Sequence, residues 1–191
     1  MQLMVPLCAL FLTISLGCFS PIANRAPGGE VFPSVAGTGL DGTAWALPED
    51  MRGAPAVVLI GFVQRSQFDI DRWILGLAQL QTPARILEVP TIPGLIPGMF
   101  ADRIDGGMRR GIPEEDWPAV VTVYDDGDAI VRFTGNTTPS NARVVLVDGE
   151  GRVSWYEDRG YSATLVTRLD AAVRALIGGP QRSAEDGPGN K

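Results

Sequence analysis

The chain has 191 residues, a formal net charge of -6, and 45% hydrophobic and 20% charged residues. This composition is typical of one globular domain, and it excludes a wholly disordered chain and a multi-span membrane protein. The chain contains no histidine, which excludes Ser-His-Asp and Cys-His catalysis and imidazole metal sites. The acidic balance argues against a nucleic-acid partner, because neutralising phosphates requires a clustered basic surface.

Both cysteines, Cys8 and Cys18, lie in an apolar N-terminal run. Residues 3–19 carry no charge but fall short of the roughly 20 apolar residues that span a bilayer, so residues 1–17 are interpreted as a signal peptide. An ordinary cleaved signal, an uncleaved anchor and a buried apolar segment are the other interpretations of this run.

The end of this run, Ser15-Leu16-Gly17-Cys18, resembles the lipobox of bacterial lipoproteins, although Ser15 stands where that family usually has leucine. The resemblance implies that Cys18 becomes the lipidated first residue of the mature protein. It also implies a periplasm-facing, lipid-anchored place in the bacterial cell envelope. By the same resemblance, Phe19 in place of aspartate slightly favours the outer membrane.

The composition of the remaining chain divides it into three parts. Residues 18–30 begin with the lipidated cysteine and are rich in proline, glycine and small residues, which predicts a flexible tether. Residues 31–178 carry the apolar periodicities of a folded domain. Residues 179–191 have little to bury, and we expect a disordered tail.

The first part of the domain alternates strand and helix patterns. Two short apolar stretches around Asp41-Gly42 indicate a β-hairpin. Residues 56–62 are continuously apolar, which is typical of a buried central strand. Apolar residues then recur at helical spacing from Ile70, and Ser66 with Asp69 gives the S-x-x-D pattern of a helix N-cap.

The second part continues with the same two periodicities. Strand patterns cover residues 85–89, 119–124, 143–147 and 152–156, the last two as an antiparallel hairpin. A helix is expected at 99–110, and a clearer one follows Ser162, with its apolar stripe running from Leu165 to Ile177. The acidic stretch 125–128 is interpreted as a turn.

This order of elements predicts an α/β fold with a central mixed sheet, an N-terminal hairpin and helices on both faces. Three segments, LDGTAWALPEDMRGAPAVVLIGF, VVTVYDD and ARVVLVDGEGRVSWYEDRG, resemble the thioredoxin-like superfamily in its membrane-tethered, peroxiredoxin-like branch. The resemblance covers about residues 31–177 and implies a thioredoxin-like three-layer sandwich. Within the superfamily, FVQRSQFDIDRW and LVDGEGRVSW most resemble the assembly factors of the mitochondrial F-type ATP synthase and their bacterial relatives.

Two landmarks of that superfamily are missing. Redox members carry C-x-x-C just after the first core strand, where a helix N-terminus lowers the pKa of a cysteine thiol. This chain has Val63-Gln64-Arg65-Ser66-Gln67 there. The family's cis-proline before the strand 143–147 would fall near Ala142, but the nearest proline is Pro139. We therefore expect no thiol–disulfide exchange, no peroxide reduction by the chain's own residues, and no cofactor.

The candidate ligand or partner rim consists of Gln64, Arg65, Ser66 and Gln67. Neutral donors and one cation at a helix N-terminus could hold an anion, a carboxylate or an extended peptide, whereas in the structural interpretation Ser66 caps the helix. The leading hypothesis is a redox-inactive envelope lipoprotein that assembles or binds a membrane-associated protein. The alternatives are an enzyme that borrows a thiol such as glutathione near Ser66, and a structural lipoprotein without a ligand.

Overall fold

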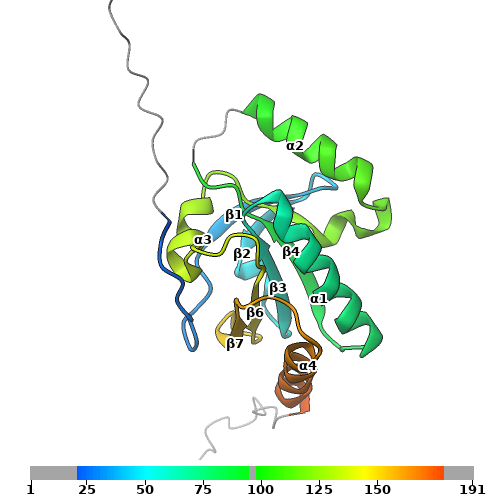
Figure 1. Ribbon diagram of the computed structural model, residues 1–191. Coiled ribbons are helices and arrows are strands. Elements are labelled where there is room, and N and C mark those ends of the chain that lie inside the picture. Colours follow the sequence, from blue (N-terminus) through cyan, green and yellow to red (C-terminus); the bar gives the residue numbers. More distant parts are fainter. Residues whose placement is uncertain (1–20, 95–97, 179–191) are drawn as a thin grey trace, which may run out of the picture.

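A computed structural model describes residues 21–94 and 98–178 of the chain. Its central sheet has four strands in the order β4-β3-β6-β7 (Figure 1). The central strand β3 is parallel to β4 and antiparallel to β6, which in turn is antiparallel to β7. The predicted mixed sheet is therefore confirmed. Its strands are β3 (Ala56–Gly61), β4 (Arg85–Pro90), β6 (Arg143–Val147) and β7 (Val153–Glu157).

A smaller sheet in the order β2-β1-β5 continues this arrangement. The strands β1 (Val35–Gly39) and β2 (Ala44–Leu47) form the predicted hairpin, and β1 also pairs with β5 (Val121–Thr122). The expected strand 119–124 is reduced to these two residues: a 3-10 helix over Glu114–Ala119 ends at its first position, and Val120 and Val123 form only isolated bridges. Single parallel bridges on either side of β5 join it to the β4 edge of the central sheet.

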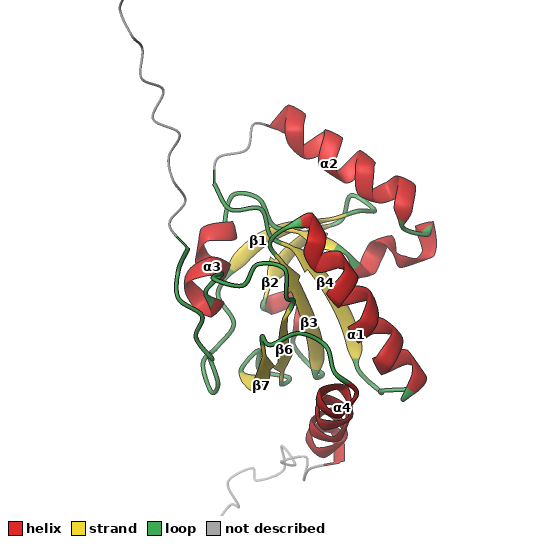
Figure 2. Ribbon diagram, in the orientation of Figure 1, coloured by secondary structure: helices red, strands yellow, loops and turns green. Residues whose placement is uncertain are grey.

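Helices cover both faces of the central sheet, as Figure 2 shows. The helices α1 (Gln67–Gln79) and α4 (Ala163–Gly178) pack on one face, where Trp73, Leu77 and Leu169 are buried. The helix α3 (Gly127–Thr134) and the β1–β2 hairpin cover the other face, where Phe32 and Phe133 meet edge to face. The helix α2 (Gly98–Gly111) crosses the upper end of the molecule in Figure 1. The three-layer arrangement is confirmed.

The helix α3 departs from the interpretation of the acidic stretch 125–128 as a turn. The helix begins at Gly127 and buries Ile130, Val131 and Phe133. Eight residues are too few for a distinct helical periodicity, so tertiary burial decides this element. In α1 and α4 the predicted apolar stripes are buried at fewer positions than expected, because Ile74 is 36% exposed and Ile177 is 46% exposed.

Residues 21–30 do not form the flexible tether that their composition suggests. Arg25 N–H donates to the Thr134 carbonyl, and Asn136 N–H donates to the Ile22 carbonyl. Farther along, Gly29 N–H donates to the Val153 carbonyl. We call residues 21–30 the strap. The strap is ordered because its backbone groups find partners in the α3–β6 loop and in β7, which composition alone does not reveal.

No helix in the described ranges 21–94 and 98–178 is long and apolar enough to cross a membrane. The proposed signal peptide 1–17, Cys18 and the predicted tail 179–191 all lie outside the described residues. These three interpretations therefore remain predictions from the sequence.

Candidate functional site

The candidate rim lies at one end of the central sheet, which we call the rim end. The strand β3 stops at Gly61, and a 3-10 turn over Gln64–Ser66 leads directly into α1. The strand β6 begins at the same end, because Arg143 pairs with Ile60. The loops that precede β6 and follow β7 therefore meet the first turn of α1 here.

Ser66 does not cap the helix, so the interpretation of Ser66 and Asp69 as an N-cap pair is wrong. The serine backbone is already helical, with φ -65 and ψ -19, whereas a capping residue needs a non-helical backbone. The side chain is only 2% exposed, and its Oγ donates to the Val63 carbonyl at 2.6 Å. The hydroxyl therefore already donates its hydrogen bond within the turn that precedes the helix.

Asp69 fastens the first turn of α1 to both neighbouring loops. Its carboxylate is buried, and it accepts hydrogen bonds from Ala142 N–H at 3.0 Å and from Tyr161 N–H at 2.8 Å. Ala142 is the position where the family resemblance would place a cis-proline. Among the described residues the cis peptide bond is Leu47–Pro48, so that landmark is absent at Ala142. We call this arrangement the Asp69 latch.

The other three rim residues differ in how far they are available to a ligand. Gln64 and Arg65 are exposed, and Arg65 takes part in none of the ion pairs found within the described residues. Gln67 is half-buried, and its amide donates to Asp71 at 2.9 Å and to Glu88 at 3.3 Å. Only Gln64 and Arg65 thus present uncommitted polar side chains to solvent.

Glu88 is a buried carboxyl beneath the rim that the sequence analysis did not single out. It lies on β4, and its Oε1 has no hydrogen-bond partner. Burial raises the pKa of the Glu88 carboxyl, and the nearby Asp71 carboxylate adds to this increase. Its position as a charged residue within the apolar strand pattern RILEV could have identified Glu88 from the sequence. Glu88 is thus a buried acidic group at the rim end whose neutral form is favoured by its surroundings.

Arg143 is fully buried at the start of β6, which the sequence analysis also missed. Its guanidinium donates to the carbonyl oxygens of Gly135, Thr138 and Asn141, and to Asn24 Oδ1 at 3.0 Å. Its central carbon lies 5.5 Å from the centroid of the Phe62 ring. Burial lowers the pKa of Arg143. The side chain thus connects the strap, the loop before β6 and the residue that follows β3.

Two large apolar side chains stand exposed beside the rim. Val63 is 42% exposed and Phe68, in the first turn of α1, is 72% exposed. Phe68 lies outside the apolar stripe of α1 that begins at Ile70. Together with Arg65, these side chains give the rim end an apolar and basic surface.

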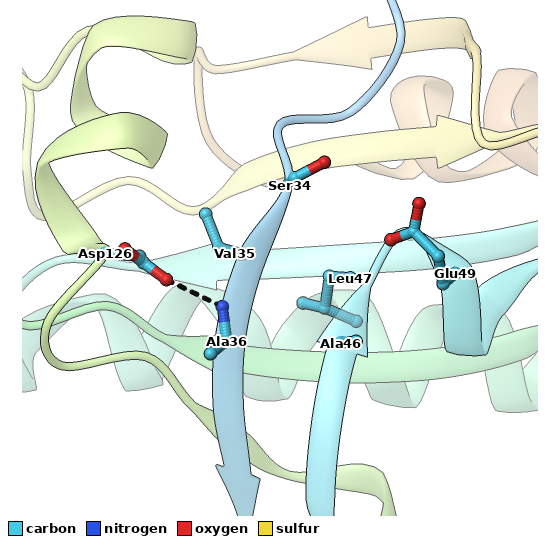
Figure 3. Close-up of a pocket in the computed structure, with 7 residues that line it drawn as sticks. All are labelled: Ser34, Val35, Ala36, Ala46, Leu47, Glu49 and Asp126. Atoms are coloured by element: carbon cyan, nitrogen blue, oxygen red, sulfur yellow. Dashed lines mark hydrogen bonds between the residues drawn. The ribbon is translucent and has the colours of Figure 1, made fainter.

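A shallow hollow of about 270 Å³ lies elsewhere, between the β1–β2 hairpin and α3 (Figure 3). Its lining residues are Ser34, Val35, Ala36, Ala46, Leu47, Glu49 and Asp126. The Asp126 carboxylate accepts the Ala36 N–H at 2.8 Å, so it is already used within the fold (Figure 3). No rim residue lines this hollow, and the described part of the chain holds no cluster of three or more metal-ligating side chains.

Comparison with known proteins identifies the fold. No family model and no curated protein matches the sequence. Yeast Sco1 with copper bound is similar in structure, with a TM-score of 0.56 and 14% identity over 83% of this chain and 99% of that chain. A thiol peroxidase from Chromobacterium violaceum has a TM-score of 0.53 and 11% identity over 78% and 89%.

The thioredoxin domain of a thiol-disulfide oxidoreductase from Bacteroides vulgatus is similar too, with a TM-score of 0.50 and 19% identity over 78% and 99%. At these identities the similarity shows the fold alone. The chain therefore has a thioredoxin-like fold, as its sequence resemblance implied.

Proposed function

We propose that this thioredoxin-like domain is a redox-inactive binding or assembly protein, held at a bacterial envelope membrane by lipid on Cys18. In this proposal the rim, Gln64, Arg65, Ser66 and Gln67, receives a membrane-associated protein partner. The observation that supports it is which side chains occupy the start of α1. Where redox members of the superfamily that the sequence resembles carry C-x-x-C, this chain has Gln64, Arg65, Ser66 and Gln67. None of these four is a thiol, and the Ser66 hydroxyl is already donated to the Val63 carbonyl.

Thiol chemistry at this helix start requires a thiolate, and none of the described residues is a cysteine. Both cysteines of the chain, Cys8 and Cys18, precede the described residues. A borrowed thiol would need a free donor near the helix start. The Ser66 hydroxyl is buried and already donated to the Val63 carbonyl, which counts against the glutathione-dependent alternative.

The available groups at the rim favour binding over catalysis. Gln64 and Arg65 are exposed and uncommitted, and Val63 and Phe68 add apolar surface beside them. Arginine next to exposed aromatic and aliphatic side chains is a composition that protein interfaces favour. The Asp69 latch keeps the surrounding loops in one arrangement, which lowers the ordering cost of binding. An assembly role resembling that of the ATP-synthase factors is the finer form of this proposal.

The test is affinity purification from detergent-solubilised membranes, with a tag placed after Lys191. The wild-type chain is compared with Cys18→Ser, with Arg65→Glu at the rim, and with Arg168→Glu as a matched control. Arg168 is an exposed arginine on α4 and is not one of the rim residues. We expect a defined partner with wild type and Arg168→Glu, and its loss with Arg65→Glu and Cys18→Ser.

Four results would contradict parts of the proposal separately. An unmodified residue 18 in mass spectra of the mature N-terminus removes the lipid anchor. A partner that Arg65→Glu retains moves the binding surface away from the rim. Recovery of the protein alone favours the purely structural lipoprotein, and retention of glutathione at millimolar concentration would revive the borrowed-thiol enzyme.

A further inference from the structure

The strap brings the start of the described chain to the rim end of the sheet. Asn24 Oδ1 accepts hydrogen bonds from Thr137 N–H at 2.9 Å and from Arg143 Nη2 at 3.0 Å. The same Arg143 guanidinium lies over the Phe62 ring, one residue before Val63. Asn24 is therefore separated from the β3–α1 turn by a single side chain. In Figure 1 the strap descends from this end along α3.

The strap also sets how far the domain can move from an anchor at Cys18. Residues 22–25 are held by the α3–β6 loop, so only three peptide links separate Cys18 from Pro21. A fully extended chain covers about 3.5 Å per residue, or about 10 Å in all. An anchor at residue 18 would thus hold the rim end close to a bilayer surface.

The rim end has the surface that a bilayer would accept. Three large apolar side chains at this end are exposed: Ile22 at 40%, Val63 at 42% and Phe68 at 72%. Arg65 stands among them without an ion-pair partner in the described part of the chain. An arginine fork suits lipid phosphates, and amphipathic surfaces of this kind bind at the headgroup level.

We propose that the rim end of the sheet docks on the lipid bilayer, with Val63 and Phe68 at the headgroup level and Arg65 on anionic phosphates. The inference rests on the proposed anchor at Cys18 and deepens the proposed function. The rim residues contact lipid while the partner is absent, and a membrane-associated partner exchanges with lipid at the same surface. The far end, which carries the β6–β7 turn and the last turn of α4, points away from the membrane.

The test uses an environment-sensitive fluorophore on single introduced cysteines. With Cys8 removed with the signal peptide and Cys18 acylated, only the new thiol reacts. The label is placed at exposed Gln64→Cys for the rim end and at exposed Ile177→Cys for the far end. The lipidated full-length product is reconstituted into vesicles of phosphatidylglycerol and phosphatidylethanolamine that contain doxyl-labelled lipid.

We expect several-fold stronger quenching at residue 64 than at residue 177. Phe68→Asp should abolish the difference. Leu75→Asp should retain it, because Leu75 is 59% exposed on the same helix but about 10 Å farther from the rim end. Asn24→Ala, which releases the strap without touching the exposed residues, should reduce the difference.

Equal quenching at the two positions overturns the docking. So does quenching that occurs in native membranes supplied with the same doxyl-labelled lipid but not in pure lipid vesicles, which would point to a protein instead. Failure of the lipid anchor is detected separately, because an unacylated Cys18 would itself carry the fluorophore. In that case the comparison is repeated with Cys8→Ser and Cys18→Ser, so that the introduced cysteine is again the single thiol while the uncleaved N-terminal run still joins the domain at residue 21. A chain that does not float with vesicles overturns both proposals.

Discussion

Removing the Asp69 carboxylate should destabilise the domain far more than removing an ordinary surface charge. The carboxylate accepts the N–H groups of Ala142 and Tyr161, and it is 4% exposed. Asp69→Ala leaves both donors without their partner. Asp69→Asn retains one carbonyl oxygen but turns an amide donor toward the second N–H.

The magnitude follows from the burial of the two donors. An unsatisfied buried N–H costs about 1–3 kcal/mol. Ala142 is fully buried, so its N–H bears that cost, whereas Tyr161 is only half-buried and water relieves part of the loss. We expect Asp69→Ala to lower the free energy of unfolding by about 3 kcal/mol and Asp69→Asn by about 1–2 kcal/mol.

The measurement is equilibrium unfolding in urea, followed by tryptophan fluorescence. For an m-value of about 2 kcal/mol/M, a loss of 3 kcal/mol lowers the midpoint by about 1.5 M. The matched control is Asp71→Asn, two residues away on the same helix. Its carboxylate is exposed and bonds only Gln67 within the described residues, so its effect should stay within about 0.5 kcal/mol.

Amide exchange separates the latch from simple charge complementarity at the helix start. If Asp69 only complements the helix dipole, Asp69→Ala costs less than about 1 kcal/mol and Asp69→Asn has a similar effect. If the latch holds the loops, the Ala142 amide loses protection in Asp69→Ala. A small loss of stability together with unchanged protection at Ala142 would refute the reasoning.

Three further predictions concern the rim end. Ser66→Cys should react with a thiol reagent much more slowly than Gln64→Cys, because Ser66 is 2% exposed and Gln64 is exposed; equal rates would contradict the buried serine. Because burial raises the pKa of Glu88, the folded chain keeps that proton to higher pH than the unfolded chain, and stability is lost as pH rises above about 4.5. Glu88→Gln should therefore raise the melting temperature at neutral pH but not below pH 4.5, and a pH-independent gain would refute this. Gly135 has φ 71, and a Cβ there would collide with the Ala23 carbonyl, so Gly135→Ala should cost about 2–3 kcal/mol and speed proteolysis within residues 21–30. Unchanged proteolysis would show that the strap does not depend on this contact.

Elements with a long apolar run or a regular apolar spacing were predictable from the sequence. The run 56–62 and the stripe beginning at Leu165 became β3 and α4, and Ser162 accepts the Leu165 N–H as a helix cap should. The short helix α3 was not predictable, because eight residues carry too little periodicity and its stability comes from the residues it buries.

The candidate site, too, was predictable from the sequence only in part. The absence of thiols after the first core strand is a property of the residue order, so the sequence alone reveals it. The roles of Ser66 and Asp69 do not follow from the residue order, because their partners Val63, Ala142 and Tyr161 are brought together by the fold. A local S-x-x-D pattern predicts a cap, but side chains bond whichever backbone groups the packing presents.

By itself, the sequence determined which side chains this protein lacks, histidine and any cysteine after Cys18, and which segments alternate between strand and helix. Both depend on residue identity and short-range periodicity. Only the tertiary structure decided that the strap lies at the rim end and that Arg143 and Glu88 are buried. Those facts depend on contacts between residues as far apart as Asn24 and Arg143, which no local pattern encodes.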